Sequence, residues 1–206
     1  MTQNLSLPES EFLICRHISD SKESIKTIQN FSVSHPETGS DLERYLKNVA
    51  IQDEADGIMR TYLVHHKITD ECVGYFSLKA GLVSTNEITL PDKSIAFDTF
   101  PGVELSNFAL NRHFQDKFKR PGLGGILFRK LITPFVLKHA ATLGINVIYL
   151  FALPYQKLIA TYEKYGFHRL PKQAEIELHR RIKPYYDKSC VFMFQPLSKL
   201  SESISM

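Results

Sequence analysis

The sequence predicts a single mixed α/β domain in which helices pack on one mixed sheet. Three observations support this fold class: a hairpin pattern over residues 60–78, a nearly all-apolar run over residues 146–153, and helical spacing of apolar residues around them. The chain has 206 residues, about the length of one domain. We expect a loose arm over residues 1–11, the domain over residues 12–197, and a flexible tail over residues 198–206.

The first half should contain helices followed by the hairpin. Residues 41–56 carry apolar side chains at helical spacing, and residues 19–31 are a second helix candidate. The Pro, Gly and Ser residues of segment 34–40 predict a loop between them. Segments 60–66 and 72–78 are rich in β-branched and aromatic residues, so they predict the two strands of the hairpin.

The second half should add three strands. Residues 146–153 are typical of a strand buried on both faces, because almost every side chain is apolar. Residues 103–110 and 190–194 are the other two strand candidates. A helix over residues 154–165 should follow the buried strand and end at Gly166, a glycine C-cap.

The longest predicted helix begins near Ile126. Apolar residues recur along it every four positions, which indicates a buried face. Pro134 should kink this helix, because proline lacks the N–H of the hydrogen-bond ladder and its ring crowds the preceding turn. Gly144 should end it.

Composition narrows the classes of function. Three widely spaced cysteines fit neither a zinc site nor a disulfide framework, so we expect no metal and a reducing cytoplasmic location. We also expect no leader and no membrane span, since no apolar run approaches ~20 residues.

The net charge of +3 divides into −6 over residues 1–100 and +9 over residues 101–206. An anionic ligand should therefore bind in the second half.

A glycine loop precedes the longest predicted helix, with Lys119 and Arg120 just before it. The loop consists of Gly122, Leu123, Gly124 and Gly125. Exposed N–H groups at a helix start, small residues and flanking cations together predict a phosphate site. The pattern lacks the third glycine of a dinucleotide fingerprint and the Gly-Lys-Ser/Thr of a P-loop. A tight turn without a ligand is the alternative.

The glycine loop, the buried strand and the segment 162–167 (Tyr-Glu-Lys-Tyr-Gly-Phe) follow one another in a way that resembles the GNAT superfamily of acyl-CoA N-acyltransferases. The loop of that family reads Gln/Arg-x-x-Gly-x-Gly/Ala, and residues 119–124 match it with Lys119 in the first place. The strand of that family reads Glu, four residues, Ala-Val; this chain has Glu104 and then Ala-Leu at 109–110. The resemblance covers roughly residues 60–194.

The resemblance implies direct transfer of an acetyl group from acetyl-CoA to a primary amine. Tyr162 would be the acid that protonates the leaving thiolate, and Glu104 the base that accepts the proton of the amine. The alternatives are a core tyrosine and a solvated carboxylate. Tyr155 stands where the family usually has Asn, so that contact departs from the pattern. The implied cofactor-binding residues are Phe108, Ala109, Leu110, Lys119, Arg120, Gly122, Leu123, Gly124, Gly125 and Tyr155.

Segments 42–50, 60–64 and 73–78 are similar to the N-terminal half of GNATs that serve as toxins in toxin–antitoxin pairs and acetylate aminoacyl-tRNA. This narrower resemblance implies a tRNA acceptor and a small antitoxin partner, and it allows for a homodimer. Two basic groups could hold RNA phosphates, or the first could serve only the cofactor while the second is solvated. They are Arg112, Lys117, Lys119, Arg120 and His179, Arg180, Arg181, Lys183. Small amines and peptide amines stay open as acceptors, and a cofactor- or nucleic-acid-binding module without turnover is the rival interpretation.

Overall fold

The computed structural model describes residues 7, 9–20, 23–89, 91–92, 95–182 and 189–204. Its contacts divide the chain into two compact units. Unit 1 comprises Met1–Lys79 and Leu105–Val136, and unit 2 comprises Ala80–Glu104 and Leu137–Met206. The strands of the described part are hydrogen-bonded in the order β1-β2-β3-β4-β5-β7-β6, which confirms the predicted mixed α/β class. No helix of this part is long and apolar enough to cross a bilayer.

Unit 1 is built on antiparallel strands. These are β1 Leu13–His17, β2 Arg60–His66 and the first part of β3 Cys72–Thr89. The hairpin of β2 and β3 is confirmed, and Val64 lies opposite both Cys15 and Gly74. β1 was not among the predicted strands, because its five residues are too few to establish an alternating pattern.

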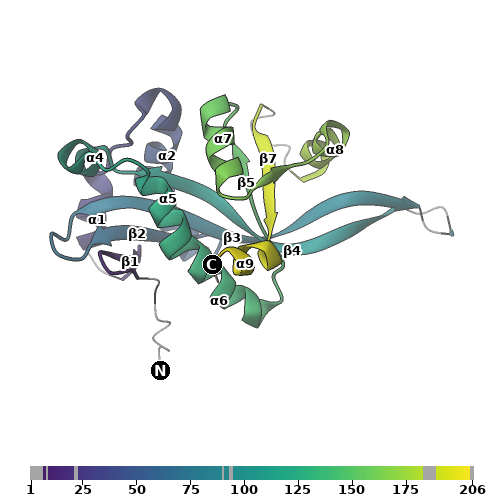
Figure 1. The fold of residues 1–206 in the computed structure, drawn as a ribbon, viewed down its shortest axis with the longest axis horizontal. Coiled ribbons are helices and arrows are strands. Elements are labelled where there is room, and N and C mark those ends of the chain that lie inside the picture. Colours follow the sequence, from purple (N-terminus) through teal and green to yellow (C-terminus); the bar gives the residue numbers. More distant parts are fainter. Residues whose placement is uncertain are drawn as a thin grey trace. The chain divides into compact units, whose positions relative to one another are not determined.

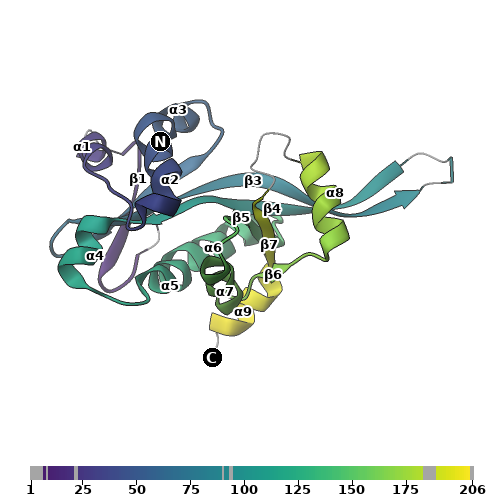
Figure 2. The same ribbon diagram turned by 90° about the horizontal axis from the view of Figure 1, so that it is seen from above.

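Three helices cover one face of these strands in unit 1, and α5 covers the other (Figure 2). The three are α1 Glu23–Gln29, α2 Pro36–Asn48 and α3 Ala50–Ala55. The predicted loop over residues 34–40 is wrong, because α2 already begins at Pro36, a residue suited to the first turn of a helix. Gly39 lies inside α2, where a Cβ atom would come within 3.3 Å of Val33. The helix breaks at Val49, whose φ is −122°.

A continuous helix with a wide turn follows the glycine loop (Figure 1). Its parts are α5 Leu123–Leu127, the π-helical turn η1 Phe128–Ile132 and α6 Thr133–Leu143. In the wide turn the N–H of Thr133 donates to the carbonyl of Phe128, five residues back. Pro134 comes next and has no N–H to donate. The irregularity expected at Pro134 therefore takes the form of a π turn, and Gly144, with φ of 67°, follows the end of α6.

Unit 2 holds the mixed part of the sheet. Its strands are the second part of β3, the first part of β4 Ile95–Leu110, β5 Val147–Ala152, β6 His168–Arg169 and β7 Val191–Pro196. β4 and β5 are parallel, whereas β7 is antiparallel to both β5 and β6. Helix α8 Lys172–Ile182 lies on one face of β5 and β7, and α7 Gln156–Lys164 lies on the other (Figure 2).

Three elements that lie wholly or partly in unit 2 differ from the expectation. β3 and β4 are 18 and 16 residues long, whereas we expected strands only at residues 72–78 and 103–110. Where we expected a tail, Leu197–Ile204 forms helix α9, with Leu197 and Leu200 buried. The apolar side chains of this amphipathic helix give it a buried face.

Candidate functional site

The glycine loop of unit 1 lies between α4 Arg112–Phe118 and α5. Lys119 adopts a left-handed conformation with φ of 45° and caps α4, and Gly122 has φ of 72° and caps α5. A Cβ atom at Gly122 would meet nothing within 4 Å, so the conformation rather than crowding requires glycine there. The first N–H groups of the helix that runs from Leu123 to Leu143 have no intrahelical acceptor and are available to an anion.

The cations around this loop are not equivalent. Lys117 pairs with Glu71 at 2.7 Å and lowers the pKa of that carboxyl, and Arg112 lies 3.5 Å from Asp116. Lys119 and Arg120 are exposed, and among the described residues neither forms an ion pair. Lys119 and Arg120 are therefore the members of the first predicted basic group whose charges are accessible to an anionic ligand.

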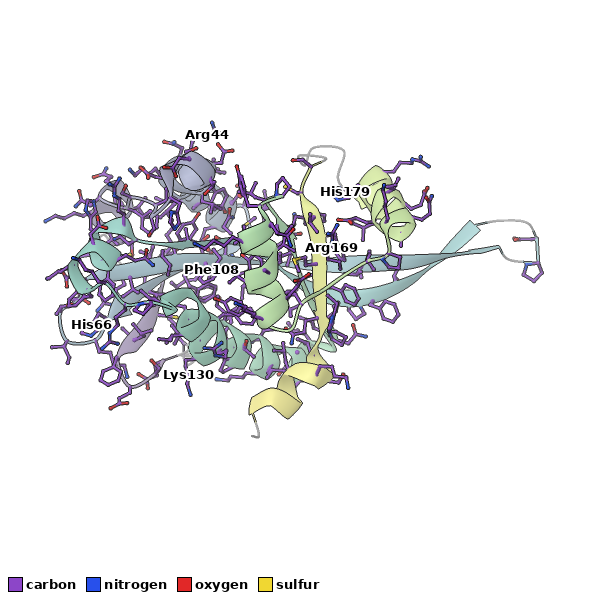
Figure 3. All side chains as sticks on the ribbon, turned by 45° about the horizontal axis from the view of Figure 1, so that its top comes forward. Arg44, His66, Phe108, Lys130, Arg169 and His179 are labelled. Atoms are coloured by element: carbon purple, nitrogen blue, oxygen red, sulfur yellow. The ribbon has the colours of Figure 1, made fainter. Side chains whose placement is uncertain are left out.

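A groove of about 320 Å³ borders the glycine loop within unit 1. Leu123 of the loop and Arg120, just before it, line this groove together with the aromatic rings of His66, Phe114 and Phe118. His66 at the end of β2 lies 5.9 Å from Phe114 and 6.1 Å from Phe118, measured between ring centroids (Figure 3). The sequence analysis missed this groove, because nothing in the spacing of these residues brings the end of β2 to α4.

The end of β4 is firmly held in unit 1. The side chain of Ala109 is buried in the core with Tyr75 and Leu46, and Phe108 is half-buried (Figure 3). Ser34 Oγ donates to the carbonyl oxygen of Leu110 at 3.1 Å. The end of β4, which carries the predicted thioester-binding N–H groups, is thus held in place by core packing and by a hydrogen bond.

The parallel pairing of β4 with β5 is short. It runs from the pair Gly102 and Val147 to the pair Glu104 and Tyr149, although β4 continues to Leu110 and β5 to Ala152. Glu104 is 1% exposed, and Tyr149, its neighbour across the two strands, is 3% exposed. Burial and, after it, the neighbouring Glu104 carboxylate raise the pKa of the Tyr149 phenol. The predicted base is thus a buried carboxylate with a phenol beside it.

Tyr162 lies in the last turn of α7 in unit 2. Its side chain is 9% exposed and packs edge-on against Tyr165 and Phe167, with centroids 6.1 Å and 5.7 Å away. Burial raises the pKa of the Tyr162 phenol well above its usual value, so the hydroxyl keeps its proton at neutral pH. The predicted C-cap, Gly166, has φ of 93°, and a Cβ there would overlap Gln195 Nε2.

Tyr155 serves as the N-cap residue of α7. Its φ of −95° is extended, its side chain makes no capping hydrogen bond, and it is 45% exposed. Its carbonyl accepts from the N–H of Ile159 at 3.0 Å. The side chain is therefore accessible to a ligand, but its contact with the cofactor stays a prediction.

Two members of the second predicted basic group, His179 and Arg180, contact acidic side chains. Arg180 donates to both carboxylate oxygens of Glu177, at 3.1 and 3.3 Å. His179 and Arg169 both contact Glu175 (Figure 3), which also accepts from the N–H of Phe192 at 2.8 Å. Lys183 lies outside the described residues. Among those that are described, no group of three His, Cys, Asp or Glu side chains could hold a metal ion.

The structure thus gathers the predicted residues in two places. Unit 1 contains residues 108–110 and the loop 119–125, and unit 2 contains Glu104, Tyr155 and Tyr162. The sequence analysis missed Tyr149, whose role becomes visible only from the register of β4 and β5.

No family model matches the sequence. Several solved structures do match its fold. A Tyr-to-Phe variant of the toxin AtaT has a TM-score of 0.66 and 18% identity, covering 98% of this chain and 99% of that one. A Tyr-to-Phe variant of KacT has a TM-score of 0.66 and 19% identity, covering 94% and 99%. AtaT complexed with acetyl-methionyl-tRNAfMet has a TM-score of 0.65 and 18% identity, covering 93% and 99%. The predicted resemblance is confirmed at the level of the fold: this chain has the GNAT fold of the toxins AtaT and KacT.

Proposed function

We propose that this chain is an N-acetyltransferase that uses acetyl-CoA, and that its acceptor is the amino group of an aminoacyl-tRNA. The observation that carries the proposal is the glycine loop. A left-handed Gly122 opens the N-terminus of a long helix, and Lys119 and Arg120 stand beside it without ion pairs among the described residues. These are the features that bind a pyrophosphate.

The other features of unit 1 fit the same co-substrate. Lys119 replaces the Gln or Arg of the family pattern, so it offers a point charge instead of a planar fork, and the phosphate contact is weaker but retained. In the aromatic groove beside the loop, the nucleobase of the co-substrate could stack on Phe118 and His66, and Arg120 could bind one of its phosphates. The N–H groups of Phe108, Ala109 and Leu110 would polarise the thioester carbonyl.

Tyr162 and Glu104 take the proton-transfer roles in this proposal. Tyr162 stays protonated at neutral pH, so its phenol donates a hydrogen bond to the sulfur as it leaves, and solvent supplies the proton that a thiol of pKa about 8.5 needs. Glu104 accepts the proton that the amine loses on attack, directly or through water. No covalent enzyme intermediate is required.

The acceptor determines how much a base contributes. A lysine-like amine has a pKa of about 10.4 and is almost entirely protonated at pH 7. An α-amine has a pKa of about 7.7 to 8.0, so roughly one-tenth of its molecules are neutral at the same pH. An aminoacyl ester presents an α-amine. An α-amine acceptor therefore depends less on Glu104 for its deprotonation than a lysine-like amine does.

Two comparisons support the tRNA acceptor and a protein partner. One matching structure is AtaT with acetyl-methionyl-tRNAfMet, and another is an AtaT variant with acetyl-CoA and the C-terminus of the antitoxin AtaR, at a TM-score of 0.66. We propose a small antitoxin as the partner of this chain. Co-expression with the product of a neighbouring gene should restore growth that expression of this chain alone arrests.

The test is transfer of a radiolabelled acetyl group from acetyl-CoA to charged tRNA, with uncharged tRNA as the control and polyamines and peptides as competing acceptors. Label on charged tRNA alone is the expected result. Label only on a small amine or a peptide would contradict the tRNA acceptor but keep the acetyltransferase. Binding of acetyl-CoA without any transfer would favour the rival interpretation of a binding module.

A further inference from the structure

Tyr149 in unit 2 is a buried titratable residue that the proposed reaction does not use. It follows Ile148 on β5 and faces Glu104 across the parallel pairing with β4. Both side chains are almost fully buried. A phenol and a carboxylate buried beside each other are a costly arrangement to build, which therefore points to a role.

Two glycines make room for the ring of Tyr149. A Cβ atom at Gly102 on β4 would lie 2.9 Å from Val147 Cγ1 and 3.0 Å from Tyr149 Cε1, so the Tyr149 ring is one of two side chains that need glycine there. A Cβ atom at Gly81 on β3 would overlap the Tyr149 hydroxyl oxygen itself. Glycine in a strand interior weakens the strand and often marks a close approach. The close approach here is that of Tyr149, which extends over β4 as far as β3.

The remaining sides of the ring are also filled. Tyr149 belongs to a core cluster with Val83 of β3 and Leu178 of α8. Its centroid lies 5.7 Å from that of Phe192 and 6.3 Å from that of Phe151. A ring enclosed in this way has one position for its hydroxyl, so the place of that hydroxyl relative to Glu104 is fixed.

We propose that Tyr149 is the positioning residue of Glu104, and that Gly81 and Gly102 are glycines because they admit its ring. The inference rests on the proposed function, in which Glu104 is the base. A phenol that donates to a carboxylate stabilises the ionised form, which is the form that accepts a proton, and it orients the oxygen that does so. Burial keeps the phenol itself protonated, since it raises the pKa of Tyr149 well above its usual value.

The first experiment compares two buried tyrosines. With an alkylamine as acceptor, Tyr149→Phe should lower kcat about 10- to 100-fold with KM for acetyl-CoA unchanged, as expected when a reacting group is misplaced by about 1 Å. The control is Tyr75→Phe in unit 1, which removes another buried hydroxyl, one that donates to the Leu42 carbonyl at 2.7 Å. It should leave kcat unchanged. Equal kcat values for Tyr149→Phe and wild type would overturn the proposal.

The second experiment keeps the tyrosine and displaces it. Gly81→Ala should lower kcat as Tyr149→Phe does, because the added methyl group occupies the place of the hydroxyl. In protein labelled with ¹³C at tyrosine Cζ, the Tyr149 resonance should shift in Glu104→Gln and in Gly81→Ala, and the Tyr75 resonance should not. If the Tyr149 resonance does not shift in Glu104→Gln, the proposed contact between Tyr149 and Glu104 is contradicted, whether or not the protein transfers acetyl groups. A wild-type protein that transfers none, yet shows the shift, would contradict the proposed function and leave the pairing intact.

Discussion

The two units contribute functional groups of different kinds. In unit 1 the groups are backbone N–H donors and the exposed side chains of Lys119 and Arg120 near Gly122. In unit 2 they are the titratable side chains of Glu104, Tyr149 and Tyr162, none more than 9% exposed. Binding a flexible polyanion needs accessible donors, whereas moving a proton needs groups whose pKa and direction are controlled by burial.

The contrast predicts which property each substitution changes. Changes in the loop of unit 1 should act on affinity for acetyl-CoA, and changes at the buried residues of unit 2 should act on the rate of transfer. A variant that violates this division would show that the two functions share residues.

Tyr162→Phe should have the largest effect. It retains the ring that packs on Phe167 and removes only the hydroxyl, so the rate of transfer should fall about 10²- to 10⁴-fold while acetyl-CoA affinity changes little. Release of CoA measured with a good acceptor reports the rate, and calorimetry reports the affinity. A wild-type rate would make Tyr162 a purely structural residue.

Gly124→Glu should have the next largest effect, on affinity alone. It places a bulky anion where we propose the pyrophosphate, so acetyl-CoA binding should weaken by about 100-fold or more, a change of at least ~2.7 kcal/mol. Gly124→Gln adds nearly the same bulk without charge and should weaken binding less. If folded Gly124→Glu and the wild-type protein bind acetyl-CoA with equal affinity, the proposed binding of its pyrophosphate at the glycine loop is contradicted.

Glu104→Gln should have an effect that depends on the acceptor. We expect about a 10²-fold loss of rate with an alkylamine and about 10-fold or less with an aminoacyl-tRNA, because the α-amine is already partly neutral at pH 7. Rates with both acceptors in the same preparation give the ratio. An identical loss for the two acceptors would argue against a base at this position.

The smallest effect is expected at the second basic group. Replacing Arg180, Arg181 and Lys183 by Ala should weaken tRNA acetylation a few-fold and flatten its salt dependence, with acetyl-CoA affinity intact. The expected effect is small, because Arg180 is already paired with Glu177. Arg44→Ala, which removes a cation paired to Asp41 on its own helix (Figure 3), is the matched control. Unchanged salt dependence would exclude this segment from the RNA contact.

Much of the fold could be predicted from the sequence because local patterns determine it. The hairpin of β2 and β3, the buried strand β5 and the glycine that follows α7 all follow from residue types at short range. The start of α2 was missed, because segment 34–40 contains residues common both in turns and in a first helical turn. The β-branched residues within 83–89 favour a strand and are consistent with the length of β3.

The candidate site divides in the same way. The glycine loop could be predicted, since left-handed conformation and helix start are encoded by Gly122 and its neighbours. The burial of Glu104 and its pairing with Tyr149 could not, because 45 residues separate them and only the register of two parallel strands brings them together. The roles of Tyr155 and Tyr162 stay predictions.

The π turn at Phe128–Ile132 holds one residue more than a turn of α-helix, because its hydrogen bond spans five residues instead of four. The wider turn takes up that residue, so the helical stretches before and after it keep nearly the same phase. Deleting one residue here should therefore restore a regular α-helix and leave the N–H groups of Gly122 and Leu123 facing almost the same way. The direction in which the loop presents its N–H groups thus tolerates a change of length six residues downstream.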